Sequence, residues 1–166
     1  NTYTFTAMWT KATSTVPYML NGEDHYAYIK GYPNGSFKPT DTITRAEAAT
    51  IFYRLLTDST RKAYATTYNS FKDVPATAWY NTAVSTMAKL GIVNGGADGY
   101  FRPNDPITRQ QMAAILWRYA QYKGVSVKAN GTTMPDFADR AEIASWAGEA
   151  VSWAYSRGIM TGKSAT

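Results

Sequence analysis

Ile43-Thr44-Arg45-Ala46-Glu47 returns 64 residues later in the chain as Ile107-Thr108-Arg109-Gln110-Gln111. The residues around this stretch repeat at the same spacing. Gly31, Gly35, Phe37, Pro39 and Asp41 correspond to Gly95, Gly99, Phe101, Pro103 and Asp105, and Ala49, Ile51 and Arg54 correspond to Ala113, Ile115 and Arg118. The chain therefore contains an internal duplication, and we expect an assembly of repeated units.

Each copy of the stretch predicts the start of a helix. The threonine hydroxyl can accept from the third helical amide, while the side chain of Glu47 or Gln111 reaches back to the threonine amide. Apolar residues then recur at helical spacing. We expect helices over residues 45–56 and 109–122, and the Asn-Gly and Asp-Gly pairs at 34–35 and 98–99 predict tight turns before them.

The arginine after each threonine is unusual, because the positive end of the helix macrodipole favours acidic side chains over basic ones. In one interpretation, Arg45 and Arg109 pair with the nearby Asp41 and Asp105 or hydrogen-bond to a loop carbonyl. In the other, free amides at the helix start and the guanidinium together bind a carboxylate or phosphate of a ligand. The sequence leaves both interpretations open.

A second motif repeats at a spacing of 67 residues from its tryptophan onward. Each copy has a Phe-x-Asp sequence, a tryptophan and a closing Gly-Ile pair: Phe71, Asp73, Trp79 and Gly91-Ile92 in one, Phe137, Asp139, Trp146 and Gly158-Ile159 in the other. A glycine followed by an apolar residue is typical of a helix C-terminus. We expect helices near residues 77–90 and 142–157, with polar linkers at 58–70 and 124–135.

The composition argues against several function classes. The 17 basic and 12 acidic residues give a net charge of +5 without a basic run, so nucleic-acid binding is not indicated. With no cysteine and one histidine, His25, we expect neither a metal nor a cofactor. No apolar window approaches about eighteen residues, so no membrane insertion is expected, and any export signal is expected upstream. A glycan-processing enzyme would need a pair of carboxylates that converge in a cleft, whereas the acidic residues here are best explained by turns, helix caps or solvated faces. We therefore do not expect an enzyme.

The two motifs together define one unit, and this unit resembles the S-layer homology (SLH) module. The residues that carry the resemblance in the complete copy are Phe71, Asp73, Trp79, Gly91, Ile92, Gly95, Gly99, Phe101, Pro103, Ile107, Thr108 and Arg109. The first copy lacks the Trp helix before Gly31, and the third stops before its turn and Thr-Arg helix. Thr-Arg-Ala-Glu at 44–47 becomes Thr-Arg-Gln-Gln at 108–111.

The resemblance implies a mainly α fold in which three SLH repeats form a pseudo-threefold assembly. Residues 16–70 would be the first repeat, 71–130 the complete second repeat and 131–166 a truncated third. Within residues 1–15, the alternation from Tyr3 to Thr10 predicts a short β segment that resembles the end of a Listeria–Bacteroides surface repeat. We also expect residues 137–162 to pack against residues 31–56, so that the incomplete copies complete one another.

SLH modules hold exported proteins non-covalently to secondary cell-wall polysaccharides, often pyruvylated. The resemblance therefore implies an extracellular, cell-wall or S-layer associated protein whose partner is an anionic polysaccharide. Carried over by position, the ligand-binding candidates are Arg45, Arg109, Gly31, Tyr32, Gly95, Gly96, Trp79 and Trp146. Burial in an apolar helix face is the favoured alternative for both tryptophans. A helical-repeat module that binds a protein partner is the rival function, and the oligomeric state is not indicated.

The position of the two arginines leads to an expectation about mutants. Replacing Arg45 or Arg109 by alanine should weaken wall binding and leave stability nearly unchanged, because an exposed first-turn arginine opposes the helix dipole. The larger loss of binding is expected at Arg109, where Gln111 replaces the acidic Glu47.

Overall fold

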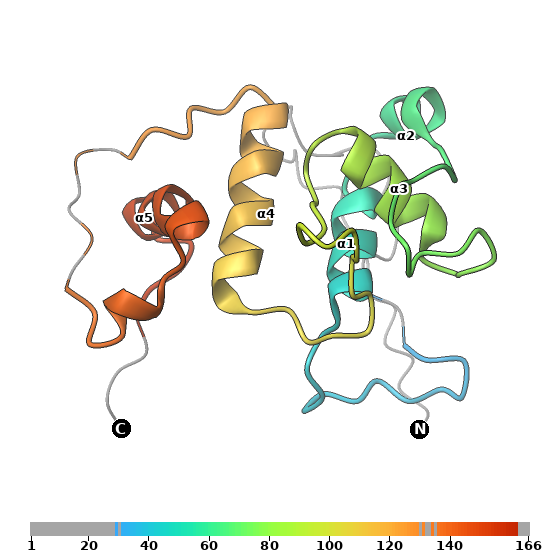
Figure 1. Ribbon diagram of the computed structural model, residues 1–166, viewed down its shortest axis with the longest axis horizontal. Coiled ribbons are helices and arrows are strands. Elements are labelled where there is room, and N and C mark those ends of the chain that lie inside the picture. The colour runs from blue at the N-terminus through green and yellow to red at the C-terminus, as the bar shows by residue number, and fades with distance from the viewer. Residues whose placement is uncertain (1–28, 30, 130, 132–133, 135, 163–166) are drawn as a thin grey trace, which may run out of the picture.

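The computed structural model describes residues 29, 31–129, 131, 134 and 136–162. These residues form five α-helices and two short 3-10 helices (Figure 1): α1 (Arg45–Arg54), α2 (Asp58–Tyr64), α3 (Asn81–Lys89), α4 (Arg109–Tyr122), η1 (Arg140–Glu142), η2 (Ser145–Ala147) and α5 (Gly148–Ser156). The described part contains no β-strand, only an isolated antiparallel bridge between Thr44 and Pro106. The mainly α prediction is confirmed, whereas the predicted N-terminal β segment lies outside the described residues.

The two Thr-Arg helices begin where the capping boxes predict. Glu47 N donates to Thr44 Oγ1 at 3.2 Å, and Thr44 N donates to a Glu47 carboxylate oxygen at 2.8 Å. In the second copy, the corresponding distances between Thr108 and Gln111 are 3.3 and 3.1 Å. Each box satisfies two amides that a helix start would otherwise leave without a partner.

The Trp-bearing helices end as predicted but begin later. Gly91 and Gly158 adopt φ of +71° and +66°, and the amides of Ile92 and Ile159 reach back into the preceding turn, as in a Schellman motif. Before α3 and α5 the chain forms single turns with i to i+3 hydrogen bonds instead of α-helix. Trp79 and Trp146 therefore lie ahead of their α-helices, not on them.

Residues 58–70, predicted as a linker, contain the short helix α2. Thr57 caps it by accepting from Thr60 N at 3.3 Å, and Asp58 and Arg61 form an ion pair on its surface. None of its residues is buried. Apolar periodicity could not reveal α2, because local capping and charge pairing stabilise it without an apolar face.

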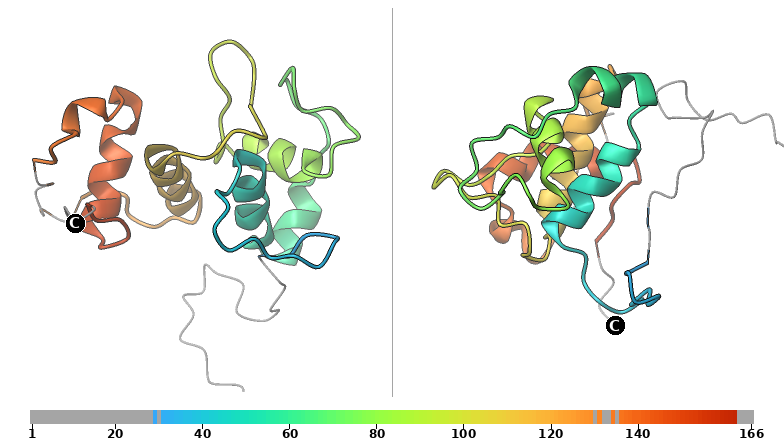
Figure 2. Two further views of the ribbon diagram at one scale, coloured as in Figure 1. Left: turned by 90° about the horizontal axis from the view of Figure 1, so that it is seen from below. Right: turned by 90° about the vertical axis from the view of Figure 1, so that its right-hand side faces the viewer.

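Helix α4 lies between the other helices, with α1 and α3 on one side and α5 on the other (Figures 1 and 2). The larger core cluster joins α1, α3 and α4 and contains Ala46, Ala49, Phe52, Leu56, Val74, Tyr80, Val84, Met87, Ile92, Val93, Phe101, Ile115 and Tyr119. The smaller cluster joins α4 to α5 through Ala113, Ala114, Ala120, Ala150, Trp153 and Ala154. Small side chains on this second face let the two helices approach closely.

The expectation that residues 137–162 pack against residues 31–56 is wrong. Helix α5 packs on α4 and η2, and α4 separates it from α1 (Figures 1 and 2). The alanine face of α4 already covers the apolar side of α5, so α5 does not need the first copy. One consequence is that Phe37 remains 65% exposed, whereas its counterpart Phe101 is 2% exposed.

The described residues include no helix that is both long and apolar enough to cross a membrane.

Candidate functional site

The loop of residues 94–105, the second-copy loop, has the turn that the sequence predicts. Gly99 takes φ of +82°, Gly99 N donates to Gly96 O at 3.0 Å, and Gly96 N donates to Tyr100 O at 2.8 Å. The first copy forms the same turn, with Gly35 at φ of +79°. Arg102 and its counterpart Lys38 also adopt positive φ, of +57° and +54°. A side chain in this region is strained, so the surrounding contacts must hold it in place.

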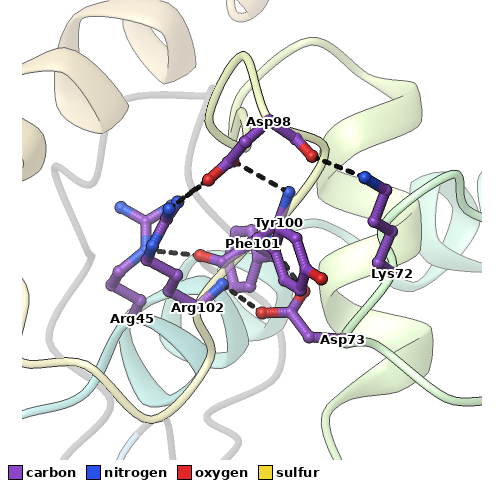
Figure 3. Close-up of polar contacts among 7 residues, drawn as sticks. All are labelled: Arg45, Lys72, Asp73, Asp98, Tyr100, Phe101 and Arg102. Carbon is purple, nitrogen blue, oxygen red and sulfur yellow. Dashed lines mark hydrogen bonds and ion pairs between the residues drawn. The ribbon is translucent and has the colours of Figure 1, made fainter.

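Asp73 supplies such contacts, as Figure 3 shows. Its two carboxylate oxygens accept from Phe101 N at 2.8 Å and from Arg102 N at 2.7 Å. Phe71 covers the start of the loop, because a Cβ atom added to Gly95 would lie 2.6 Å from its ring. The Phe-x-Asp sequence thus fixes the shape of the loop that follows it by about 25 residues in the chain.

Arg45 crosses from α1 to this loop (Figure 3). Its Nε donates to Phe101 O at 2.7 Å and its Nη2 donates to Asn94 O at 3.0 Å. The guanidinium also lies 4.7 Å from the centre of the Phe101 ring, a cation–π distance. Burial lowers the pKa of Arg45 below its usual value, although arginine stays charged in proteins. Of the two interpretations, the contact with loop carbonyls is therefore present, and no aspartate of the described residues forms an ion pair with Arg45.

The amides at the start of α1 are not free. Arg45 N donates to Asp105 O and Ala46 N donates to Pro103 O, both at 2.9 Å. The interpretation in which free amides at this helix start bind a ligand therefore does not hold for the first copy, because the second-copy loop already occupies the amides of Arg45 and Ala46.

Arg109 makes the corresponding contact one unit further on. Its Nη2 donates to Thr161 O at 2.6 Å, and Thr161 is the counterpart of Asn94 at the 67-residue spacing. Gly162 lies beneath Phe137 as Gly95 lies beneath Phe71, with 2.8 Å between an added Cβ and the ring. Arg109 itself is exposed, in contrast to the half-buried Arg45.

A cavity of about 570 Å³ lies against the second-copy loop, and we call it the inter-repeat groove. Four sequence candidates line it: Arg45, Gly95, Gly96 and Trp146. They come from the first, second and third copies, so side chains and backbone of all three units line one cavity. A larger hollow of about 780 Å³ beside Trp117 contains none of the eight candidates.

The other four candidates lie elsewhere. Gly31 and Tyr32 belong to the first-copy loop, where the Tyr32 hydroxyl donates to Glu47 at 2.9 Å; this bond raises the pKa of Tyr32. Arg109 is held by Thr161, and Trp79 packs edge-on against Tyr80 at 5.3 Å. Trp79 and Trp146 are 66% and 54% exposed, so the prediction that favoured their burial is wrong.

The charged side chains that line the inter-repeat groove are mainly basic. The charged residues that line it are Arg45, Arg102, Arg118 and Asp105. Arg102 also forms an ion pair with Asp98, which does not line the groove. In the sequence, Arg118 is marked only as the repeat of Arg54. Its position could have indicated more, because Arg118 follows Gln111 by seven residues and therefore lies on the same face of α4.

The groove offers guanidinium donors, loop backbone and an indole ring. Within the described residues, no three His, Cys, Asp or Glu side chains form a group that could hold a metal ion. This set of groups is suited to recognising an anionic, ring-containing ligand by charge, hydrogen bonds and stacking.

Comparison with known proteins identifies the unit. The sequence model of the family described as S-layer homology domain matches residues 17–49, 70–113 and 136–166 of the chain. The chain is 35% identical over 155 residues to cell surface glycoprotein 1 of Acetivibrio thermocellus. The aligned region covers 90% of this chain and 6% of that protein. It is 36% identical over 101 residues to the cellulosome-anchoring protein of the same organism, covering 61% of the chain and 23% of the relative.

A third relative is the surface-layer 125 kDa protein of Lysinibacillus sphaericus, 35% identical over 137 residues that cover 82% of this chain and 11% of the relative. The chain thus spans less than a quarter of the length of each of these proteins. The matched segments contain Arg45, the second-copy loop, Arg109 and Thr161, so both contacts between neighbouring units fall inside them. This match over most of the chain means that the protein belongs to the S-layer homology family of extracellular, cell-wall-associated anchoring modules.

Proposed function

We propose that the chain anchors an exported protein to the bacterial cell wall by binding a secondary cell-wall polysaccharide in the inter-repeat groove. The observation that carries this proposal is the convergence of Arg45, Arg118 and Trp146 around Gly95 and Gly96 in one cavity. Guanidinium groups suit a carboxylate on a sugar, and an exposed indole suits the apolar face of a sugar ring. We further propose that the anionic group is a pyruvyl ketal, which places a carboxylate on the sugar.

The groove supports binding, not hydrolysis. A glycoside hydrolase needs two carboxyl groups flanking the scissile bond, about 5–9.5 Å apart. Asp105 is the one carboxylate among the described residues that line the groove. The activity of the larger protein would then reside outside this chain, which supplies the attachment.

Repetition of the contact would raise the affinity for a polymer. We propose residues 16–70, 71–130 and 131–166 as three repeats, in which the contact of Arg109 with Thr161 marks a second groove. One charged hydrogen bond contributes only about 1.5–3 kcal/mol. A polymer with regularly spaced acidic sugars can bind neighbouring grooves at once, so that the effective local concentration strengthens weak single sites.

Binding to purified walls tests the proposal. Sacculi freed of protein should retain the chain in a sedimentation assay, and chemical extraction of the secondary polysaccharide should abolish retention. Trp146→Ala should weaken binding at least several-fold, because Trp146 lines the groove. Trp79→Ala is the matched control, since Trp79 occupies the same motif position outside the groove.

Two outcomes would contradict the proposal. Unchanged retention on extracted sacculi would show that the polysaccharide is not the partner. Retention only on sacculi that still carry protein would favour the rival function, a helical-repeat module that binds a protein partner. Removal of pyruvyl groups from the polysaccharide then tests the finer assignment, because binding should fall while the polymer stays intact.

A further inference from the structure

We infer that Arg118, and not Arg45 or Arg109, is the residue that recognises the acidic substituent of the polysaccharide, beside a sugar ring that stacks on Trp146. This inference rests on the proposed function, because it assigns a role within the inter-repeat groove.

The three arginines of the groove differ in how many of their guanidinium donors are already hydrogen-bonded within the protein. Arg45 uses its Nε and Nη2 for the carbonyls of Phe101 and Asn94. Arg102 directs both of its terminal nitrogens at the carboxylate of Asp98. The structure gives Arg118 no hydrogen bond and no ion pair with any residue that it describes. Arg118 therefore has donors available for an oxygen supplied by a ligand.

The surroundings of Arg118 leave its charge uncompensated. It is half-buried, and burial lowers the pKa of its guanidinium without a carboxylate that raises it. Glu149 lines an adjoining cavity of about 290 Å³ that Arg118 also lines, but the two side chains form no ion pair. A partly desolvated cation with unmet donors is costly to the free protein, and an anion in the groove would remove that cost.

Arg118 and Trp146 are shared between two cavities. Both residues, together with Ala114, line the 570 Å³ groove and the adjoining 290 Å³ cavity. The two spaces therefore meet at these side chains. A ring placed against the indole of Trp146 lies beside the guanidinium that α4 presents, so one sugar can engage both residues.

The first copy lacks the same arrangement. Tyr32 stands at the position of Gly96 and Glu47 at that of Gln111, and the Tyr32 hydroxyl donates to the Glu47 carboxylate at 2.9 Å. The first copy thus carries a phenol and a carboxylate where the inter-repeat groove has a glycine and a neutral amide. Selection for an anion is accordingly expected at the second copy, next to Arg118.

The test compares two ligands that differ only in charge. Isothermal titration would use an acidic fragment of the wall polysaccharide and the same fragment with its carboxyl groups converted to amides. The wild-type chain should bind the acidic fragment about tenfold or more tightly, the value expected for one charged hydrogen bond. Arg118→Gln should bring the ratio of the two affinities close to one, with little change for the amide fragment.

Further variants separate charge recognition from a structural effect. Arg118→Lys should restore part of the ratio, because it keeps the charge without the planar fork. Arg140→Gln removes an equal charge in the third unit, outside the groove, and should leave the ratio unchanged. Trp146→Ala should weaken both fragments alike and preserve the ratio. Circular dichroism checks that each variant is folded. If Arg118→Gln does not fold, Arg118→Lys serves as the test, and its ratio of the two affinities should be lower than that of the wild-type chain.

The possible results distinguish the two proposals. If the wild-type chain binds neither fragment, the proposed function is refuted. If it prefers the acidic fragment and neither Arg118→Gln nor Arg118→Lys lowers the ratio, the proposed function stands and the role of Arg118 is refuted. A preference that disappears in Arg45→Lys but persists in the Arg118 variants would assign the acid to Arg45 instead.

Discussion

Replacing Arg45 by alanine should destabilise the chain far more than the equivalent change at Arg109. Arg45 is half-buried and donates two hydrogen bonds to the second-copy loop, at 2.7 and 3.0 Å. Charged hydrogen bonds contribute about 1.5–3 kcal/mol each, or roughly 3–6 kcal/mol for the pair. Water can replace the guanidinium at the exposed Asn94 carbonyl, and relief of the unfavourable helix dipole returns about 0.3–1 kcal/mol. We therefore expect a net loss of about 2–4 kcal/mol.

Arg109 provides the matched comparison. It is exposed, and to the described residues its side chain donates one hydrogen bond, to Thr161 O at 2.6 Å. Solvent can replace this bond, and the same relief of the dipole applies, so Arg109→Ala should cost less than about 1 kcal/mol. The sequence-based expectation of unchanged stability is thus retained for Arg109 and revised for Arg45. A loss of wall binding in Arg45→Ala would consequently mix folding with recognition.

Urea unfolding followed by far-ultraviolet circular dichroism measures the difference. The transition of Arg45→Ala should move to lower urea at an unchanged slope, as expected when stability changes and the exposed area does not. Arg45→Lys should lie between alanine and wild type, because an ammonium can donate to one carbonyl without the planar fork. Equal, small losses of stability for Arg45→Ala and Arg109→Ala would contradict a stabilising role of Arg45, since they would show that its contact with the second-copy loop contributes little.

Asp73→Ala should lower the free energy of unfolding in urea by about 2–4 kcal/mol, because two loop amides lose a charged acceptor. Asp139→Ala, at the same motif position, should lower it by under about 0.5 kcal/mol. Similar losses for the two variants would contradict the role of Asp73 in holding the loop. Desolvation raises the pKa of Glu47, but hydrogen bonds from Thr44 and Tyr32 outweigh it and hold the pKa below its ordinary value of 4.5. The stability that Glu47 contributes is then complete above pH 4.5 and is lost as the pH falls through the lower folded value. Urea midpoints of wild type and Glu47→Gln should therefore converge below pH 4.5, and a constant difference would contradict this assignment.

Sequence reasoning succeeded where a few neighbouring residues determine the conformation. The capping boxes placed the starts of α1 and α4, and the Gly-Ile pairs placed the ends of α3 and α5. In each case the hydrogen bonds join residues within one or two turns of each other. Such motifs can be read without knowing the rest of the fold.

The reasoning failed where residues distant in the chain decide the environment. Arg45 meets carbonyls that lie 49 and 56 residues away, and nothing local distinguishes them. The spacing of apolar residues predicts that Trp79 and Trp146 lie on the buried face of a helix. Each tryptophan instead precedes its α-helix and is exposed, which the spacing cannot reveal. Closure of the ends was expected from the missing halves, whereas the second apolar face of α4 decided where α5 packs.

The structure also explains why an arginine occupies the first turn of α1, at the positive end of the helix dipole. The guanidinium of Arg45 leaves its own helix for the neighbouring loop, while the carbonyls of Asp105 and Pro103 satisfy the helix amides in return. Thr44-Arg45 therefore connects two units, because the start of α1 and the second-copy loop exchange hydrogen bonds. This exchange fixes the loop that lines the inter-repeat groove, so folding and the shape of the groove depend on the same contacts. An arginine engaged in this way positions the wall of the groove, which is the physical reason to seek recognition of the ligand's charge at Arg118.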